Sequence, residues 1–238
     1  MLTQRKPNPA IVLAALLLGA VSVWPWQSHA ADRGVAIAAP AIDNPKIPGT
    51  AQTAVLSGGC FWGVQGVFEH VRGVQRVVAG YAGGARDTAH YDMVGTGRTG
   101  HAESVQVSFD PAQISYGEIL QVFFSVAHDP TELNRQGPDV GSQYRSEIFY
   151  HDATQKQIAE SYIAQLNQAH AFPRAIATRV DALPGFYAAE DYHQDFLQHN
   201  PTYPYIVYND LPKIDNLKRL LPGEYLGQPI LLSNVAAR

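Results

Sequence analysis

The stretch SGGCFWGVQGVFEHV, residues 57–71, holds the only cysteine of the 238-residue chain, Cys60. Apolar residues after it recur at helical spacing, and the residues before it are typical of a short strand. The free N–H groups and the dipole at a helix N-terminus favour an anion, so a thiol placed there has a lowered pKa. Because the thiolate is the nucleophilic form, Cys60 is a candidate for nucleophilic catalysis.

The residues on either side of the cysteine allow two interpretations. Gly58 and Gly59 leave room for a substrate and allow a sharp turn with positive φ. Phe61 and Trp62 could form the wall of a pocket for a small apolar group. The alternative is that Cys60 and the two aromatic residues belong to the core face of an amphipathic helix, because lone cysteines often behave as small buried hydrophobes. This stretch alone leaves both interpretations open.

Hydrophobic spacing predicts the elements that would position the cysteine. Alternation of apolar and polar residues indicates strands, and a period near 3.6 indicates helices. Ser115, with Glu118 three residues later, forms a capping box that opens a helix. The predicted strands cover residues 53–59, 74–84, 102–111, 145–151 and 175–183, and the predicted helices begin near residues 61, 115, 152 and 188. This order predicts an α+β fold, in which helices cover a mixed sheet with a split βαβ, ferredoxin-like core.

The two ends of the chain differ in composition from its middle. Residues 1–30 have a basic start, an apolar middle and a small-x-small end, which is the pattern of a secretory signal peptide. Residues 31–52 are rich in Ala, Pro and Gly and predict a flexible linker. Residues 53–238 predict one domain with an irregular tail from about residue 200. We therefore expect an exported, periplasmic protein, with an uncleaved N-terminal membrane anchor as the alternative.

Charge and motif content argue against several classes of ligand. The formal net charge is −4 and no cluster of basic residues occurs, which argues against nucleic acid as a partner. No dinucleotide-binding or phosphate-binding glycine motif occurs, and the nine histidines show no metal-ligand spacing. We expect no bound nucleotide, metal or other cofactor.

Six motifs distributed along the chain carry a family resemblance. They are GGCFWG, GYAGG, HY, GHAESVQVSFDP, HDPTELNRQGPDVGSQYRS and AEDYHQDF, in this order. Together they resemble the type A peptide-methionine sulfoxide reductases over residues 54–201. The resemblance implies reduction of the S epimer of methionine sulfoxide, free or in proteins, and so repair of oxidised proteins. It also implies that a thiolate attacks the sulfoxide sulfur and is left as a cysteine sulfenic acid.

The resemblance also implies roles for residues outside the cysteine stretch. Glu103 matches the family's general acid, which must hold a proton near pH 7 in order to protonate the departing oxygen. Tyr91 and Tyr144 match two hydroxyl donors to the sulfoxide oxygen. Asp139 matches a carboxylate near the site, which we interpret as orienting other groups. The Phe-Trp pair after the cysteine matches the walls that hold the substrate's methyl group.

The chain departs from the family pattern at its C-terminal end. Many members carry resolving cysteines there, which attack the sulfenic acid and form an internal disulfide, and this chain has none. The sulfenic acid must then be reduced by an external thiol: a small thiol, a glutaredoxin-like protein or a thioredoxin-like domain. We expect a thioredoxin-like electron donor as a partner, besides the oxidised substrate proteins.

Two other functions are compatible with a lone cysteine. A Cys-His hydrolase or acyltransferase would use a distant histidine as base and would turn over without a reductant. A secreted binding domain would keep Cys60 buried and inert. His101, His128 and His193 lie inside the matched motifs, and we expect structural roles for them.

Overall fold

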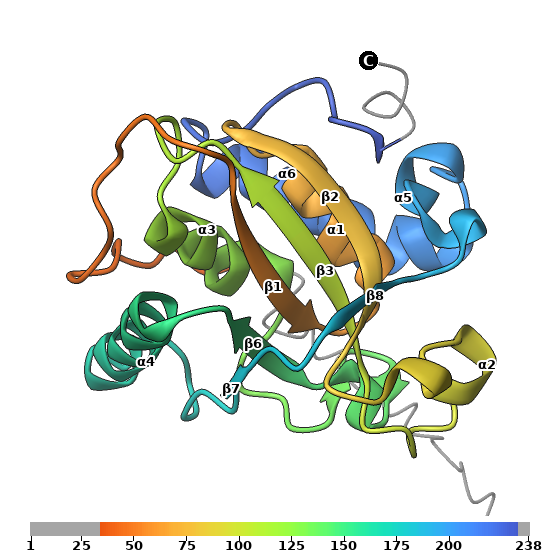
Figure 1. Cartoon of the computed structure of the whole chain (residues 1–238). Helices are drawn as coiled ribbons and strands as arrows, with labels where there is room; N and C mark the ends of the chain where they lie inside the picture. Colours follow the sequence, from red (N-terminus) through yellow and green to blue (C-terminus); the bar gives the residue numbers. More distant parts are fainter. Residues whose placement is uncertain (1–33, 233–238) are drawn as a thin grey trace, which may run out of the picture.

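The computed structural model describes residues 34–232, which fold around a six-stranded sheet in the order β7-β6-β1-β3-β2-β8 (Figure 1). The strands of this sheet are β1 Gln52–Gly58, β2 Val74–Ala82, β3 Ala102–Phe109, β6 Ser146–Tyr150, β7 Arg179–Ala182 and β8 Phe186–Ala188. The α-helices are α1 Phe61–Glu69, α2 Tyr91–Val94, α3 Tyr116–Val122, α4 Ala153–Gln168, α5 Phe196–His199 and α6 Leu211–Leu220. A two-stranded ladder of β4 Arg135–Gln136 and β5 Asp139–Val140 lies in a loop outside the main sheet.

The connections confirm the predicted α+β class and its split βαβ core. Strand β3 lies between β1 and β2 and is antiparallel to both, while α1 connects β1 to β2. Strand β6 is antiparallel to β1 and completes a four-stranded core. The sheet is mixed because β7 pairs with β6 in the parallel direction. This topology brings the C-terminal end of β1 and the N-terminal end of β3 side by side, which positions the site described below.

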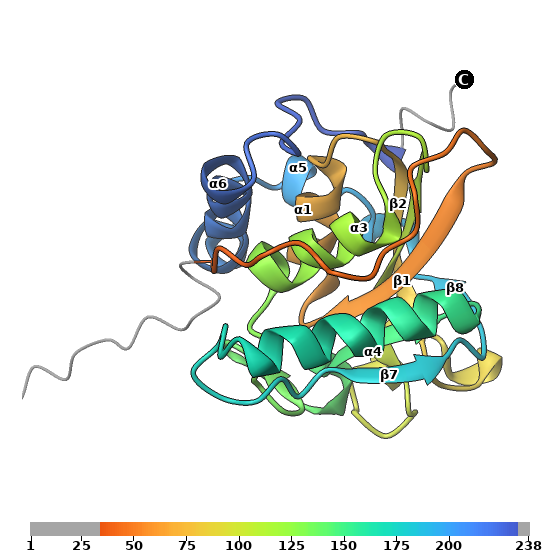
Figure 2. The same cartoon turned by 90° about the vertical axis from the view of Figure 1, so that its left-hand side faces the viewer.

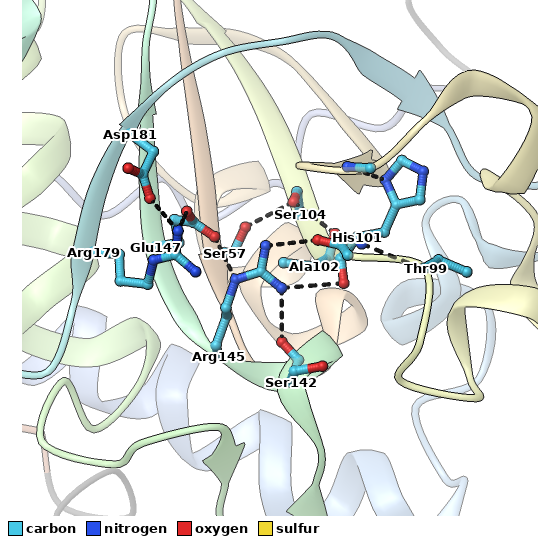
Figure 3. Close-up of polar contacts among 12 residues, drawn as sticks. Ser57, Thr99, His101, Ala102, Ser104, Ser142, Arg145, Glu147, Arg179 and Asp181 are labelled. Atoms are coloured by element: carbon cyan, nitrogen blue, oxygen red, sulfur yellow. Dashed lines mark hydrogen bonds and ion pairs between the residues drawn. The ribbon is translucent and has the colours of Figure 1, made fainter.

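Helices α1, α3 and α6 lie on the same side of the sheet (Figure 2). The apolar residues of α1 that recur at helical spacing are buried against this side, as the sequence predicted. Alternate residues of the strands, such as Leu56 and Val105, belong to the same core, while Val55 and Phe149 pack in a second cluster. Within the described residues, the face away from α1 carries no long helix (Figure 1). It carries this second apolar cluster and polar side chains such as Arg145 and Glu147 (Figure 3).

The part of the predicted linker that the structure describes, residues 34–51, forms a strap without helix or strand that packs on the domain. The strap runs across α3 and beside α4 (orange in Figure 2). Its Ala38 carbonyl accepts a hydrogen bond of 2.6 Å from the Tyr162 hydroxyl, and Asp43 accepts one of 2.8 Å from the backbone N–H of Gly117. Such single polar contacts leave no hydrophobic period in the sequence, so the pattern could not reveal them.

The tail after residue 200 is also ordered, which corrects the predicted irregular tail. A π-helical turn over Ile206–Asp210 leads into α6, and α6 packs against α1. Pro212 is the second residue of α6 and directly follows the π-helical turn. The fully buried Leu217 attaches this helix to the core.

The helix predicted from residue 188 does not form as one element. A 3₁₀ turn over Asp191–His193 and the short helix α5 are separated by Asp195, which has a left-handed φ of 53°. The intervening Gln194 side chain bonds both the N–H and the C=O of Ala79 at 2.9 Å, which holds the segment against the edge of β2. This long-range pairing outweighs the helical spacing of the apolar residues.

Candidate active site

Cys60 lies between the end of β1 and the first residue of α1, as predicted. Gly59 has the predicted positive φ, 91°. A Cβ added to Gly59 would lie 2.5 Å from Gln136 Cβ, and one added to Gly58 would lie 3.0 Å from His128 Cγ. The room predicted for a substrate at these glycines is therefore filled by the protein's own side chains. The glycines serve the turn and close packing instead.

The thiol opens onto a small cavity of about 150 Å³. Its lining residues are Cys60, Phe61, Trp62, Tyr91, Glu103, Asp139, Tyr144 and Tyr205. The structure thus brings all seven residues selected from the sequence to one place, and adds Tyr205. A cavity of that volume holds a molecule about as large as benzene, so it can receive the end of a side chain but not a whole peptide.

Glu103 is the second residue of β3, and its side chain lies on the face of the sheet that α1 covers. The side chain is buried, and its Oε2 accepts a hydrogen bond of 3.0 Å from the backbone N–H of Phe61. Burial raises the pKa of Glu103 to about 8, although the Phe61 N–H acts in the opposite direction. The group therefore carries a proton at neutral pH, as a general acid must.

Tyr91 and Tyr144 reach the cavity from two separate loops. Tyr91 begins α2, and its backbone N–H donates a 3.0 Å hydrogen bond to Glu190. Tyr144 ends a 3₁₀ turn that starts at Ser142. Burial, and then the charge of Glu103, raises the pKa of Tyr91 to about 12, and the pKa of Tyr144 is raised for the same reasons. Neither hydroxyl bonds to another residue within 34–232, so both can donate to a ligand.

Asp139 accepts a short hydrogen bond from the hydroxyl of Tyr205. Burial raises the pKa of the Asp139 carboxyl, while this bond and the ammonium of Lys213 lower it. Tyr205 was missed because it lies in the tail predicted to be irregular, among several other tyrosines that share its local sequence character. No spacing in that tail distinguishes the tyrosine that faces the cavity from the exposed Tyr208.

The apolar wall of the cavity is held by aromatic contacts. Trp62 stacks on Phe196 with ring centroids 3.8 Å apart, and its indole N–H donates to His193 Nδ1 at 3.1 Å. The ring of His193 also contacts Phe61 and Tyr91, at centroid distances of 5.0 and 4.4 Å. Burial lowers the pKa of His193, so the ring is neutral and packs among the aromatic residues. This matches the structural role that the sequence predicted for it.

Comparison with known proteins identifies the family. A family model described as peptide methionine sulfoxide reductase matches residues 52–223. The chain belongs to this family. The peptide methionine sulfoxide reductase MsrA 2 of Mesorhizobium japonicum is 60% identical over 191 residues, which cover 80% of this chain and 97% of that protein. The peptide methionine sulfoxide reductase MsrA 2 of Synechocystis sp. is 52% identical over 183 residues, 76% of this chain and 86% of that protein.

Solved structures agree with this membership. Methionine sulfoxide reductase A of Corynebacterium diphtheriae superposes with a TM-score of 0.56 at 33% identity, covering 75% of this chain and 93% of that one. Mxr1 from Saccharomyces cerevisiae in reduced form gives a TM-score of 0.58 at 31% identity, covering 68% and 92%. Among the functions compatible with a lone cysteine, the comparisons favour a sulfoxide reductase over a hydrolase or an inert binding domain.

The thiol of the reductase differs from the sequence-based expectation in its acidity. Burial raises the pKa of Cys60 well above its ordinary value, and the charges of Glu103 and Asp210 raise it further. The backbone N–H of Trp62 at the N-terminus of α1 lowers the pKa but is outweighed. The free enzyme therefore holds Cys60 as a thiol at neutral pH.

A buried ion pair lies under the first turn of α1. The Nζ of Lys213 is 3.1 Å from Oδ1 of Asp210, and both side chains are buried. Gly63 makes this approach possible, since a Cβ there would lie 2.0 Å from the same carboxylate oxygen. The pair contributes to the electrostatics of the reductase site, because Asp210 raises the pKa of Cys60 and Lys213 lowers that of Asp139.

Proposed function

We propose that this reductase converts the S epimer of methionine sulfoxide, free or in proteins, to methionine, with Cys60 as the nucleophile. The observation that supports this most directly is the combination of a thiol, an aromatic wall and several O–H donors in one small cavity. The end of a methionine sulfoxide side chain has a methyl group, a polar oxygen and a reactive sulfur between them. The aromatic wall suits the methyl group, the O–H donors suit the oxygen, and the thiol can attack the sulfur. The sulfur is pyramidal, and a cavity with a fixed methyl wall and fixed donors accepts one epimer.

In the proposed complex, the methyl group lies against Phe61 and Trp62, and the oxygen points to Tyr91, Tyr144 and Glu103. The protonated state of these three groups supports the arrangement, because each can donate to the oxygen as negative charge develops there. Only the end of the oxidised side chain enters the cavity. The same site can thus act on the free amino acid and on a residue of a protein.

The proposed reaction needs no external proton. The sulfur of Cys60 attacks the sulfoxide sulfur while Glu103 gives its proton to the oxygen, and the thiol proton passes to the Glu103 carboxylate. The protonated oxygen then moves from the substrate sulfur to the sulfur of Cys60 as the transient S–S bond and the S–O bond of the substrate break, which leaves Cys60 as a sulfenic acid. The sulfoxide sulfur gains two electrons, and the cysteine sulfur loses two. Because the thiol proton replaces the one that is donated, the raised pKa values of both groups are compatible with turnover.

Regeneration of the thiol requires a reductant from outside, since Cys60 is the only cysteine. A first thiol attacks the sulfenic acid to give a mixed disulfide and water, and a second thiol releases Cys60 as the free thiol. A thioredoxin-like dithiol protein would supply both thiols and is the donor that we favour. A glutaredoxin-like protein or a small thiol would serve by the same chemistry.

A single-turnover experiment without reductant tests this function. One equivalent of the S epimer should release one methionine per enzyme and leave the protein one oxygen heavier, whereas the R epimer should do neither. Mass spectrometry of peptides should place the oxygen on Cys60, where dimedone traps it. A monothiol added afterwards should give a mixed disulfide at the same residue.

Three results would contradict the proposal. Product release with an unmodified Cys60 would remove the sulfenic acid from the mechanism. Continued turnover without a thiol would favour a hydrolase or another non-reductive activity. Equal reduction of the two epimers would show that the cavity does not select one configuration of the sulfoxide sulfur.

The proposal for the cellular location of the enzyme depends on its N-terminal residues. The signal peptide predicted for residues 1–30 lies outside the residues that the structure describes. Among residues 34–232, no helix is long and apolar enough to cross a bilayer. We propose export to the periplasm with cleavage after Ala30, in view of the basic start, apolar middle and small residues of this segment.

N-terminal sequencing of protein purified from cells should therefore read from Ala31. Cell fractionation should recover this form outside the cytoplasm, because a cleaved signal peptide implies translocation. An intact Met1 in the cytosolic fraction would rule out export, and an intact Met1 in the membrane fraction would favour the anchored alternative.

A further inference from the structure

This inference rests on the function proposed above, in which three groups face the sulfoxide oxygen. These groups come from three separate segments. Tyr91 follows the loop after β2, Glu103 follows the loop before β3, and Tyr144 ends the turn before β6. No hydrogen bond joins these three side chains to one another within residues 34–232. Their relative positions must therefore be fixed by contacts made elsewhere, and the structure places those contacts around Arg145 (Figure 3).

The Arg145 guanidinium is buried and bonds in several directions at once. Its Nη1 donates to the carbonyls of Ser142 and His101 at 2.9 and 3.2 Å, and its Nη2 donates to the carbonyl of Gly100 at 2.9 Å. Its Nε donates to Glu147 at 2.5 Å, which fixes the plane of the guanidinium. Ser142 and His101 each lie two residues before a group that faces the cavity. One side chain thus connects the Tyr144 turn to the segment that leads into Glu103.

The third loop is attached through His101. Its Nδ1 accepts from the Gly84 N–H at 3.2 Å, so its Nε2 carries the proton and donates to the Ala85 carbonyl at 2.9 Å. Both partners lie in the loop that leads to Tyr91. Gly83 allows this loop to pass close to the guanidinium. It has a positive φ of 97°, and a Cβ there would lie 2.8 Å from Nη2 of Arg145.

We propose that Arg145 is a positioning residue for sulfoxide reduction, and that with His101 it sets Tyr91, Glu103 and Tyr144 in one geometry around the substrate oxygen. Its planar fork of donors reaches three carbonyls and a carboxylate together, which a lysine ammonium cannot reproduce. The residue acts from the face of the sheet away from α1 and does not line the cavity. It holds the donors in place and takes no part in the reaction itself.

Cys60 and the methyl wall are not held directly by this cluster. They lie between β1 and α1 and on α1, and no hydrogen bond of Arg145 reaches them. The proposal therefore predicts a specific pattern. Loss of the Arg145 contacts should slow the chemical step far more than it changes thiol reactivity or binding of the methyl group.

Arg145→Lys tests this pattern. We expect the single-turnover rate constant at saturating sulfoxide to fall by about 10²-fold, the loss that follows a misplacement near 1 Å. The half-saturating sulfoxide concentration should change much less than the rate constant. The rate of Cys60 alkylation should change far less than the rate constant, because only the charge of Glu103 connects the thiol to the displaced groups. The rate should also begin to fall at lower pH than in the parent, because a displaced Glu103 is better hydrated and its pKa moves down toward the ordinary value.

Arg179→Lys is the matched control. Arg179 belongs to the same polar cluster, 2.6 Å from Asp181 and 3.5 Å from Glu147, but it is exposed and bonds to none of the three loops. We expect parental rates for this variant. If Arg145→Lys does not fold, Glu147→Gln keeps the guanidinium, weakens its anchor and should show the same pattern to a smaller degree.

Any one of three outcomes overturns the proposal. The first is a parental rate constant in the folded Arg145→Lys or Glu147→Gln protein. The second is an equal loss in Arg179→Lys, and the third is a loss of thiol reactivity in parallel with the rate, since either of these would indicate a general effect on the fold. A change in the rate constant that is specific to Arg145 and Glu147, accompanied by the shifted pH profile, supports the positioning role.

Discussion

Cys60→Ser should retain the fold and lose reduction of methionine sulfoxide by about 10⁴-fold or more, as enzymes do when their nucleophile is removed. The serine hydroxyl is a much weaker nucleophile toward sulfur than the thiol, and it cannot take up oxygen as a sulfenic acid. The side chain of Cys60 makes no capping hydrogen bond to α1, so the substitution changes little besides the reacting atom. The measurement is methionine released from the S epimer with excess dithiol.

Thermal unfolding and the fluorescence of Trp62, which stacks on Phe196, serve as controls for the fold of this variant. Both should match the parent. More than trace activity in a correctly folded Cys60→Ser protein would show that another group attacks the sulfoxide.

Glu103→Gln should lower the single-turnover rate constant by about 10²–10⁴-fold, which is the usual contribution of a general acid. The amide has the shape of the carboxyl and can still accept from the Phe61 N–H, so position is preserved while the acidic proton is lost. Alkylation of Cys60 should persist, and above about pH 8 it should become faster than in the parent, because there the charge of Glu103 is one of the causes that raise the thiol pKa.

The pH profile gives a second test of the same residue. With a pKa of about 8, Glu103 holds its proton below that pH and loses it above, so the parental rate should fall as the pH rises through about 8. An ionised Glu103 also raises the pKa of Cys60, which acts in the same direction. This fall should be absent in Glu103→Gln. A parental rate and profile in the variant would exclude Glu103 as the acid.

Glu69→Gln is the matched control. Glu69 is also buried with a raised pKa, but it ends α1, about 12 Å along the helix from its first residue at 1.5 Å per residue. The same isosteric change there should leave the rate and its pH dependence as in the parent. A loss equal to that of Glu103→Gln would mean that neutralising any buried carboxyl disturbs the site.

The sequence alone determined those features that depend on neighbouring residues. The capping box of Ser115 and Glu118 is present, with both reciprocal hydrogen bonds, because its partners are three residues apart. The helical spacing after Cys60 and the alternation in residues 102–109 are confirmed as α1 and β3 for the same reason. The order of the motifs was sufficient to select seven residues that line one cavity, although their catalytic roles remain predictions.

The tertiary structure decided what depends on groups far apart in the chain. The strap over residues 34–51 and the Tyr205 contact with Asp139 join segments that no local pattern relates. The same holds for the acidity of Cys60. Its position before a helix predicted a lowered pKa, but burial by residues from several elements raises it, because desolvation of the thiolate outweighs a single backbone N–H. A periodic pattern shows which face of an element is buried, whereas the dielectric and the charges around a buried atom are set only when distant segments pack together.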